Sequence, residues 1–370
     1  MGNIPQRYKV ILGMSGGVDS SVAAARLQAQ GHEVIGVTLK LWEGEEGPEG
    51  RWQDRSCCKV GIARYVCERL GIPHHLFNAE EAFERDVIQD FGAEYLSGRT
   101  PNPCVRCNER VKFGHLIKVA EKFGADYLAT GHYARVEYDS NSNRYQLLKG
   151  VDETKDQSYF LYRLSQRQLS RVWFPLGDLK KEAVWKEAEN LGLPADEIRE
   201  SQEICFVTQK GYRGFIEERY PEALKTGEMV TADGKVLSHH RGLSMYTVGQ
   251  RRGLGIPAGQ RLYVTHLDPV KNQVLVGPEE ALFQQELFAQ DLNYVGISTF
   301  DSDVWVKAKI RYRTPEQSAR VQSISENSFR LTFKSPQKAI TPGQSVVLYD
   351  GDRVLAGGII ERGKGLRLTG

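Results

Sequence analysis

The sequence predicts an α/β fold with three parts: an N-terminal domain built on a parallel sheet, a small central β-rich domain and a C-terminal β-barrel. Apolar runs alternate with amphipathic segments over residues 8–131, a Gly-rich and basic stretch begins near residue 213, and apolar and polar residues alternate after about residue 285. Strands that alternate with helices favour a parallel sheet, and period-two segments favour a barrel or sandwich. The expected domains are 1–212, 213–285 and 286–370.

The N-terminal elements follow from hydrophobic periodicity. Three apolar, β-branched runs are expected to be strands: KVILGM (9–14), EVIGVTLKLW (33–42) and DYLATG (126–131). Three segments carry apolar residues at helical spacing and stop at glycine, as helices do: residues 20–31, 61–71 and 109–124. Because these strands and helices alternate along the chain, we expect helices on both faces of the sheet.

The C-terminal elements follow from period-two alternation. RLYVTHLDPVKNQVLVG is expected to form two strands around a turn at Asp268-Pro269. The expected barrel strands are VWVKAKIRYR (304–313), SARVQSI (318–324), SFRLTF (328–333) and the two halves of QSVVLYDGDRVLAGGIIERG (344–363), which join at an Asp350-Gly351 turn. Side chains repeat every two residues along a strand. We therefore expect one face of the first of these strands to carry Lys307, Lys309, Arg311 and Arg313.

The composition is typical of a soluble globular protein, with 370 residues of which 40% are hydrophobic and 26% charged. No apolar run approaches the roughly 18–20 residues that span a bilayer, and the N-terminus leads directly into a strand-like run without a cleavable signal. We therefore expect a cytoplasmic protein that makes no membrane contact and is a monomer when free. In that compartment the six cysteines are expected to be thiols that serve as core residues, metal ligands or reactive groups.

GMSGGVDSS, residues 13–21, lies where the first strand leads into the first helix. Glycines let the backbone approach an oxyanion, and a helix N-terminus offers unpaired N–H groups and a positive dipole end. Ser15, Ser20 and Ser21 add hydroxyl groups, whereas Asp19 would repel phosphate and is expected to hold Mg²⁺ or to orient the loop. A serine-capped turn is the simpler interpretation, but this combination of residues predicts a phosphate site. The sequence has no G-x-x-x-x-G-K-S/T motif, so transfer of a γ-phosphate is not expected.

RTPNPCVRCNERVKFG, residues 99–114, places Cys104 and Cys107 three positions apart in a basic segment. Such a pair can be half of a zinc site, a redox disulfide, two cluster ligands, or a nucleophile with a neighbour. Zinc is disfavoured because a structural site needs four ligands, and the sequence has no second C-x-x-C pair and no H-x₃₋₅-H spacing. At the start of the expected helix, Cys107 would gain thiolate character from the helix dipole and from Arg106 and Arg110.

Six motifs together resemble a known family. They are GMSGGVDSS, GRTPNPCVRCNERVKFG, ATGHYAR (129–135), KDQSYFLYRL (155–164), SQEICFV (201–207) and YTVGQRRGLG (246–255). The first resembles the pyrophosphate loop of ATP-pyrophosphatases, and the set is similar to that of the tRNA-specific 2-thiouridylases over essentially the whole chain. The resemblance implies an N-terminal PP-loop domain of the adenine nucleotide alpha hydrolase type. It also implies ATP-dependent replacement of O2 by sulfur on the wobble uridine, uridine 34, of tRNA, with release of AMP and pyrophosphate.

The resemblance also assigns roles to individual residues. Cys107 corresponds to the nucleophile and Cys205 to the cysteine that accepts a persulfide sulfur from a donor, such as a cysteine desulfurase or a relay protein. ATP with Mg²⁺ would contact Gly13, Met14, Ser15, Gly16, Gly17, Val18, Asp19, Ser20, Leu39 and Gly131. The tRNA would contact Asn102, Pro103, Cys104, His132, Lys155, Asp156, Gln157, Arg311, Tyr312 and Gln344.

Cys104 stands where many members of the family have Asp. It could take over the contact with the base, form a resolving disulfide with Cys107, or join Cys107 and Cys205 as the third ligand of a 4Fe–4S cluster whose open iron holds the sulfide. A cluster and a persulfide relay through Cys205 and Cys107 remain the two alternatives for the sulfur step. The other cysteines are expected to be non-catalytic: Cys57, Cys58 and Cys67, the last in the core.

Basic stretches surround these motifs and suit a nucleic acid. Residues 98–122 hold six Lys or Arg against two Glu, and residues 235–252 hold four basic and no acidic residues. A solvated face would also be basic, and the resemblance favours tRNA. Two competing functions are another adenylating enzyme with the same loop and a zinc-dependent RNA-binding module, neither of which explains the full motif set.

Overall fold

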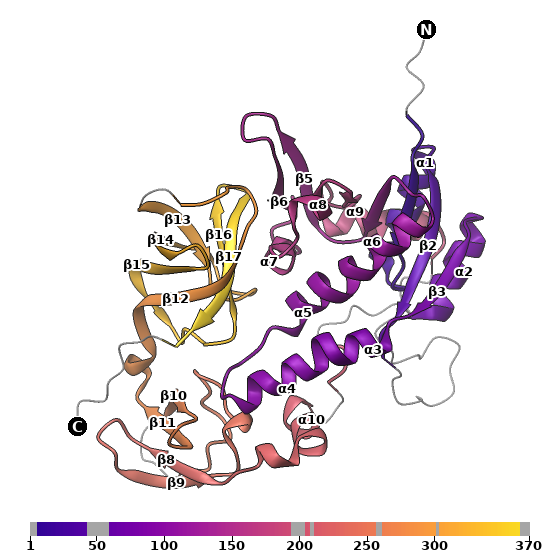
Figure 1. The fold of residues 1–370 in the computed structure, drawn as a ribbon. Coiled ribbons are helices and arrows are strands. Elements are labelled where there is room, and N and C mark those ends of the chain that lie inside the picture. The colour runs from indigo at the N-terminus through magenta and orange to yellow at the C-terminus, as the bar shows by residue number, and fades with distance from the viewer. Residues whose placement is uncertain are drawn as a thin grey trace. The chain divides into compact units, whose positions relative to one another are not determined.

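The computed structural model describes residues 6–42, 59–193, 204–207, 211–256, 261–300 and 303–362. The chain forms two compact units, which we describe separately (Figure 1). Unit 1 contains Met1–Val87, Cys104–Phe206 and Asp352–Val354. Unit 2 contains Ile88–Pro103, Val207–Gly351 and Leu355–Gly370.

A five-stranded parallel sheet forms the centre of unit 1. In spatial order its strands are β3 (His74–Asn78), β2 (Glu33–Lys40), β1 (Lys9–Gly13), β4 (Tyr127–Thr130) and β7 (Val172–Trp173). Every pairing between neighbours is parallel. The three strands predicted from apolar runs are confirmed as β1, β2 and β4, and β3 and β7 extend the sheet at its two edges. β2 has six consecutive buried residues, as expected for a strand that is covered on both faces.

The described helices between β1 and β4 follow the expected alternation. They are α1 (Val18–Ala29), α2 (Val60–Leu70), α3 (Glu80–Phe83), the π-helical η1 (Glu84–Ile88), α4 (Gln89–Leu96), α5 (Pro103–Arg106), the π-helical η2 (Cys107–Lys112) and α6 (Phe113–Lys122). The helices expected at 20–31 and 61–71 are confirmed as α1 and α2. The helix expected at 109–124 begins earlier than predicted, because α5, η2 and α6 follow one another without a gap. Pro103 is its first residue, and its fixed φ suits the first turn of a helix.

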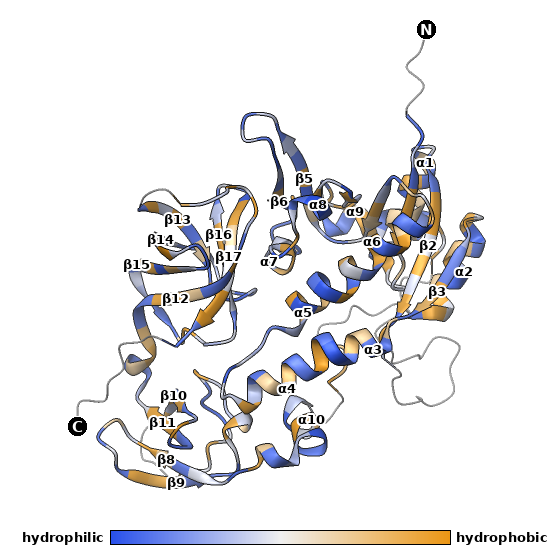
Figure 2. Cartoon of the chain, viewed as in Figure 1, coloured by the Kyte–Doolittle hydropathy of each residue, from blue (hydrophilic) through white to orange (hydrophobic). Residues whose placement is uncertain are grey.

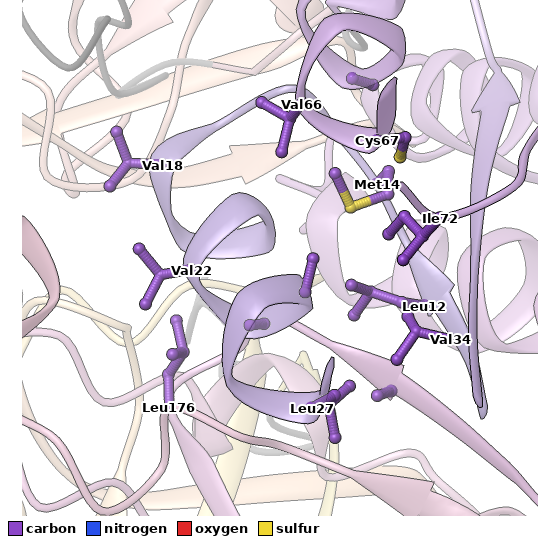
Figure 3. Close-up of a cluster of buried hydrophobic side chains, with 14 of the residues drawn as sticks. Leu12, Met14, Val18, Val22, Leu27, Val34, Val66, Cys67, Ile72 and Leu176 are labelled. Carbon is purple, nitrogen blue, oxygen red and sulfur yellow. The ribbon is translucent and has the colours of Figure 1, made fainter. Parts of the chain in front are cut away.

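The core of unit 1 lies between the sheet and helices α1 and α2. Figure 3 shows Val18, Val22 and Leu27 of α1 among the labelled side chains of this core, with Leu12 and Cys67. Cys67 is fully buried, so its expected place in the core is confirmed. A Cβ atom on Gly36 of β2 would lie 2.7 Å from the Cys67 Sγ atom. Glycine therefore permits the close contact between β2 and α2.

Unit 1 is completed by a hairpin and by short helices. The hairpin consists of β5 (Ala134–Asp139) and β6 (Arg144–Lys149), which pair antiparallel. The helices are α7 (Ser158–Leu161), α8 (Gln166–Leu169) and α9 (Lys181–Asn190). None of the helices in the described residues is long and apolar enough to cross a bilayer.

The central part of unit 2 holds a four-stranded sheet. Its order is β10 (Tyr263–Asp268), β11 (Gln273–Gly277), β8 (Gly227–Val230) and β9 (Val236–His240). The predicted turn between β10 and β11 is confirmed, and the Asp268 carboxylate accepts hydrogen bonds from the Val270 and Lys271 amides at 3.0 Å. Beside this sheet, α10 (Gly211–Arg219) packs on α4 through Phe215 and Phe91, whose ring centroids are 5.8 Å apart.

The remainder of unit 2 is a closed β-barrel. Its strands in order are β12 (Phe283–Tyr294), β15 (Ser328–Lys338), β14 (Gln317–Ser325), β13 (Val304–Lys309), β16 (Ser345–Asp350) and β17 (Arg353–Glu361). Pairing of β12 with β17 closes the ring, so the predicted barrel is confirmed. Figure 2 shows predominantly apolar colours along β17, which has seven consecutive buried residues. The predicted Asp350-Gly351 turn is confirmed, and Gly351 has a φ of +58°.

One barrel strand is shorter than predicted. The run 304–313 was expected to be one strand, but β13 ends at Lys309. The prediction that Arg311 and Arg313 share a strand face with Lys307 and Lys309 is therefore wrong. The Arg311 guanidinium instead donates hydrogen bonds to the Ala339 carbonyl oxygen and the Thr341 hydroxyl, because the chain turns after the strand.

Candidate active site

The pyrophosphate loop, residues 13–21, connects β1 to α1 in a fixed conformation. Gly16 has a φ of +75°, and a Cβ atom there would lie 2.3 Å from the Lys59 carbonyl oxygen, so only glycine fits. The Ser20 and Ser21 hydroxyls both donate to the Gly17 carbonyl oxygen at 3.0 Å. These contacts hold the loop at the N-terminus of α1, where unpaired N–H groups favour an anion.

Two further residues expected at the ATP site lie in the sheet of the same unit. A Cβ atom on Gly131, just after β4, would lie 2.8 Å from the Asp19 carbonyl carbon and the Ser20 amide nitrogen. Glycine at this position thus lets the end of β4 touch the first turn of α1. Leu39 is buried on β2, the strand next to β1. The residues expected to bind ATP are therefore contributed by β1, α1, β2 and the end of β4.

Asp19 is held by two side chains that the sequence did not single out. Its Oδ1 atom accepts a hydrogen bond from the Tyr133 hydroxyl at 2.7 Å. The same atom forms a hydrogen-bonded ion pair with Lys181 Nζ, also at 2.7 Å. The Lys181 side chain is 8% exposed, and its ammonium lies 4.9 Å from the Trp185 ring centroid. This geometry fixes the Asp19 carboxylate, and its two expected functions, holding Mg²⁺ and orienting the loop, stay predictions. It also places a buried cation beside the pyrophosphate loop.

The three candidate sulfur-transfer cysteines all belong to unit 1. Cys104 is exposed in α5, Cys107 is buried in η2 and Cys205 is partly exposed, and the structure gives all three as thiols. Because the helical run begins at Pro103, Cys107 lies in its second turn, and the expectation that it starts a helix is wrong. The dipole acts mainly on the first turn, which here contains Cys104.

The three cysteines are not part of a metal-ion site within the described residues. Within the described residues, which include Cys104, Cys107 and Cys205, no three His, Cys, Asp or Glu side chains are grouped so as to hold a metal ion. The cluster and the persulfide relay both stay predictions. Mg²⁺ does not require such a group, since it commonly takes one or two carboxylates together with phosphate oxygens of the substrate. Cys57 and Cys58 lie outside the described residues.

Charges around Cys107 are paired through Glu109. The Glu109 carboxylate lies 3.1 Å from the Arg106 guanidinium, 2.7 Å from that of Arg163 and 3.9 Å from that of Arg110. The two arginines that were expected to act on Cys107 therefore share their charge with this carboxylate. Next to Cys107, the buried Asn108 donates through Nδ2 to the Phe160 carbonyl oxygen at 3.3 Å, which connects η2 to the FLYRL segment.

His132 follows the glycine at the end of β4. Its Nδ1 atom lies 2.7 Å from the Thr130 hydroxyl, and its ring packs against Phe113 and Phe174. Burial, and to a smaller extent the positive charge of Lys112, lower the pKa of His132 to about 3. The imidazole is therefore neutral at physiological pH. A neutral ring can orient a base by hydrogen bonding or stacking, but it does not attract phosphate.

Two of the residues in the Lys155-Asp156-Gln157 group stabilise their own loop. Asp156 is buried, and its carboxylate accepts hydrogen bonds from the Gly150 amide and from the amide and hydroxyl of Ser158. Gln157 Oε1 accepts from the Tyr133 amide at 2.9 Å. These contacts fix the loop beside Tyr133, which binds Asp19. Lys155 is half-buried. Its contact with tRNA stays a prediction.

The remaining predicted tRNA contacts belong to unit 2, apart from Cys104. Gln344 Nε2 donates to the carbonyl oxygens of Thr100 and Pro101 at 2.9 and 3.0 Å, directly before Asn102 and Pro103. The Lys309 ammonium lies 5.5 Å from the Tyr312 ring centroid. Within unit 2, Gln344 thus binds the backbone of the turn that precedes the cysteine pair.

Comparison with known proteins shows which family combines these features. A family model described as the tRNA methyl transferase HUP domain matches residues 8–209. Models described as a tRNA methyl transferase PRC-barrel domain and an aminomethyltransferase β-barrel domain match residues 213–278 and 284–360. A tRNA-specific 2-thiouridylase of Caldanaerobacter subterraneus is 48% identical over 357 residues, which cover 96% of this chain and 98% of the relative.

The chain belongs to the tRNA-specific 2-thiouridylase family. Two further members are similarly close. The 2-thiouridylase of Acetivibrio thermocellus is 47% identical over 96% of this chain and 99% of its own, and that of Clostridioides difficile is 43% identical over 96% and 98%. The 2-thiouridylase fold therefore extends over both units of the chain, and the family resemblance seen in the six motifs is confirmed.

Proposed function

We propose that this 2-thiouridylase replaces O2 of uridine 34 in tRNA with sulfur at the expense of ATP. The observation that supports this most directly is that a preformed pyrophosphate loop, Cys107 and Cys205 all belong to unit 1. We further propose that it works in the cytoplasm as a monomer, receives sulfur from a separate donor protein, and has domains that meet near residues 213 and 286.

The first step is activation of the base. The uracil O2 atom attacks the α-phosphorus of ATP, and the bond to the β-phosphate oxygen breaks, so pyrophosphate leaves and an adenylate forms. The loop backbone and the N-terminus of α1 bind the pyrophosphate, and Lys181 offsets negative charge beside it. Asp19, oriented by Tyr133 and Lys181, keeps the first turn of α1 in place. Bound Mg²⁺ would neutralise charge on the phosphates.

The second step is sulfur transfer by a persulfide relay. The terminal sulfur of a Cys205 persulfide attacks C2 of the base, and AMP leaves with the former O2 atom. Cys107 then attacks Cys205 Sγ, which releases 2-thiouridine and forms a Cys107–Cys205 disulfide. A dithiol reductant supplies the two electrons that return both cysteines to thiols. We derive no step through a cluster, because no three His, Cys, Asp or Glu side chains of the described residues are grouped so as to hold a metal ion.

The proposal is tested with iron-free protein, ATP and Mg²⁺, a cysteine desulfurase as persulfide donor and a tRNA transcript with uridine at position 34. Nucleoside mass spectrometry should find 2-thiouridine with one AMP and one pyrophosphate per sulfur. Cys107→Ser and Cys205→Ser should each abolish thiolation. Cys104→Asp should retain it, because the exposed Cys104 has no part in the relay. Iron and sulfide bound to anaerobically purified protein, together with loss of activity in Cys104→Asp, would contradict the relay.

A further inference from the structure

Trp305 is exposed on the outer face of the barrel in unit 2. The residue is 65% exposed, and it is the one exposed tryptophan among the described residues. Its neighbours on β13, Val306 and Ala308, face the barrel core and are buried. An isolated exposed apolar residue implies nothing by itself. The residues around Trp305 make this position different.

The strands beside Trp305 are basic. In the antiparallel pairing of β13 with β14, Trp305 lies opposite Arg320 and Lys307 lies opposite Ser318. The Arg320 side chain is 56% exposed and the Lys307 side chain is exposed. Neither β13 nor β14 contains an acidic residue. Asp303, directly before β13, lies 3.1 Å from the Arg320 guanidinium and holds it beside the tryptophan.

The basic row continues along the strand. Lys309 projects from the same face as Trp305 and Lys307, since side chains repeat every two residues. Its position is roughly 13 Å from Trp305 at the rise of a strand. The Lys309 ammonium lies over the ring of Tyr312, one of the residues expected to contact tRNA. An aromatic face between spaced cations is how proteins bind unpaired nucleotides, the ring stacking on a base while the cations contact phosphates.

We propose that Trp305 is a stacking platform for an unpaired base of the tRNA substrate, with Lys307, Lys309 and Arg320 contacting the neighbouring phosphates. This rests on the proposed function, since it takes tRNA as the substrate. The positive charge of this face favours RNA as the partner over a second copy of the chain. In an interface between two protein chains, a central tryptophan is surrounded by further apolar residues, and lysine is rare. We name this surface, residues 305, 307, 309 and 320, the barrel platform.

The test compares full-length wild-type protein with Trp305→Ala and Trp305→Phe, using an unmodified tRNA transcript without ATP. Trp305→Ala should weaken binding by roughly 5- to 150-fold, the range for loss of one stacked base. Trp305→Phe should bind within about threefold of wild type, because it keeps an aromatic face. Ile324→Ala, which removes an exposed apolar side chain from β14, should bind as wild type does.

Two readouts separate stacking from a structural role. Tryptophan fluorescence should be quenched when tRNA binds to wild type, and this part of the signal should be missing from Trp305→Phe. Lys307→Gln and Arg320→Gln should each reduce the slope of log Kd against log salt by about one.

If Trp305→Ala binds tRNA like wild type while thiolation proceeds, the platform is wrong and the proposed function stands. Sedimentation that shows a dimer lost in Trp305→Ala, with unchanged tRNA affinity, would also overturn the platform. If wild type does not thiolate tRNA, the proposed function itself fails.

Discussion

The Lys181 ammonium lies 2.7 Å from the Asp19 carboxylate, although 162 positions separate the two residues. Asp19 belongs to the first turn of α1, and Lys181 is the first residue of α9. The pair thus connects the pyrophosphate loop to α9, the last helix in the described part of unit 1. Because Lys181 is nearly buried, its charge is screened less by solvent than that of a surface lysine.

Replacing Lys181 by Met should therefore impair adenylation. We expect the rate of tRNA-dependent pyrophosphate release to fall at least tenfold, and the free energy of unfolding to fall by about 1–2 kcal/mol as the charged hydrogen bond to Asp19 is lost. Pyrophosphate release assays and urea unfolding measure the two effects. The exposed neighbour Lys180 provides the control, and Lys180→Met should change neither quantity. Equal effects of both variants would show that the ion pair has no special role.

Gly131→Ala should disrupt the ATP site without unfolding the chain. The new methyl group would lie 2.8 Å from backbone atoms of Asp19 and Ser20, and backbone cannot give way as a flexible side chain can. We expect the KM for ATP to rise at least tenfold, measured by steady-state pyrophosphate release. The matched control is Gly61→Ala in α2, where a Cβ atom meets nothing within 4 Å. This variant should gain about 0.5–1 kcal/mol of stability from helix propensity and keep normal kinetics.

His132 should make the folded protein less stable in acid. Its pKa is about 3 in the folded state against 6.5 ordinarily, so below pH 6.5 the unfolded state binds a proton that the folded state does not. Stability should therefore be complete above pH 7 and decrease as the pH falls through 6.5, by at most about 1.4 kcal/mol at pH 5.5 for this group. The side chain keeps some solvent exposure, which reduces the effect. Urea unfolding at pH 7.5 and 5.5 should show a smaller difference in His132→Asn than in wild type.

Cys67 should resist alkylation that modifies Cys104. Burial, with a smaller contribution from Glu68, raises the pKa of the Cys67 thiol to about 12, so almost no thiolate is present at pH 8. Cys104 is exposed and should react first with iodoacetamide, whereas Cys67 should react only when the chain unfolds. Peptide mass spectrometry over time gives the order of modification. Early labelling of Cys67 in native protein would contradict its place in the core.

The features that could be predicted from sequence are those that depend on local pattern. β1 and β2 are long apolar runs, and α1 and α2 repeat apolar residues at helical spacing, so they were identified close to their true bounds. The start of the helix at Pro103 could not be predicted, because CVR carries no periodic pattern. The end of β13 was also missed, since IRYR continues the alternation while the chain has already turned.

The candidate site divides in the same way. The pyrophosphate loop and the cysteine pair are contiguous motifs, so both can be located in the sequence, whereas the expected role of the pair came from the family resemblance. Lys181 and Tyr133 reach Asp19 only because β4, β7 and α9 fold back beside β1. Trp305 was missed for another reason, since the exposure of a tryptophan is decided by which face of the barrel it occupies. Contacts that depend on tertiary folding leave no signal in a single sequence.

The hydrogen bonds from Gln344 to Thr100 and Pro101 have a consequence for domain engineering. Residues 88–103 lie between two segments of unit 1 in the sequence, yet they belong to unit 2, which also contains the barrel. The chain leaves that unit at Pro103 and continues directly into the helical turns that carry Cys104 and Cys107. A barrel transplanted from a relative as a self-contained cassette would therefore have to bring its own partner for the Thr100-Pro101 carbonyls. Without one, the exchange would also alter the anchoring of the turn that leads into Cys104 and Cys107.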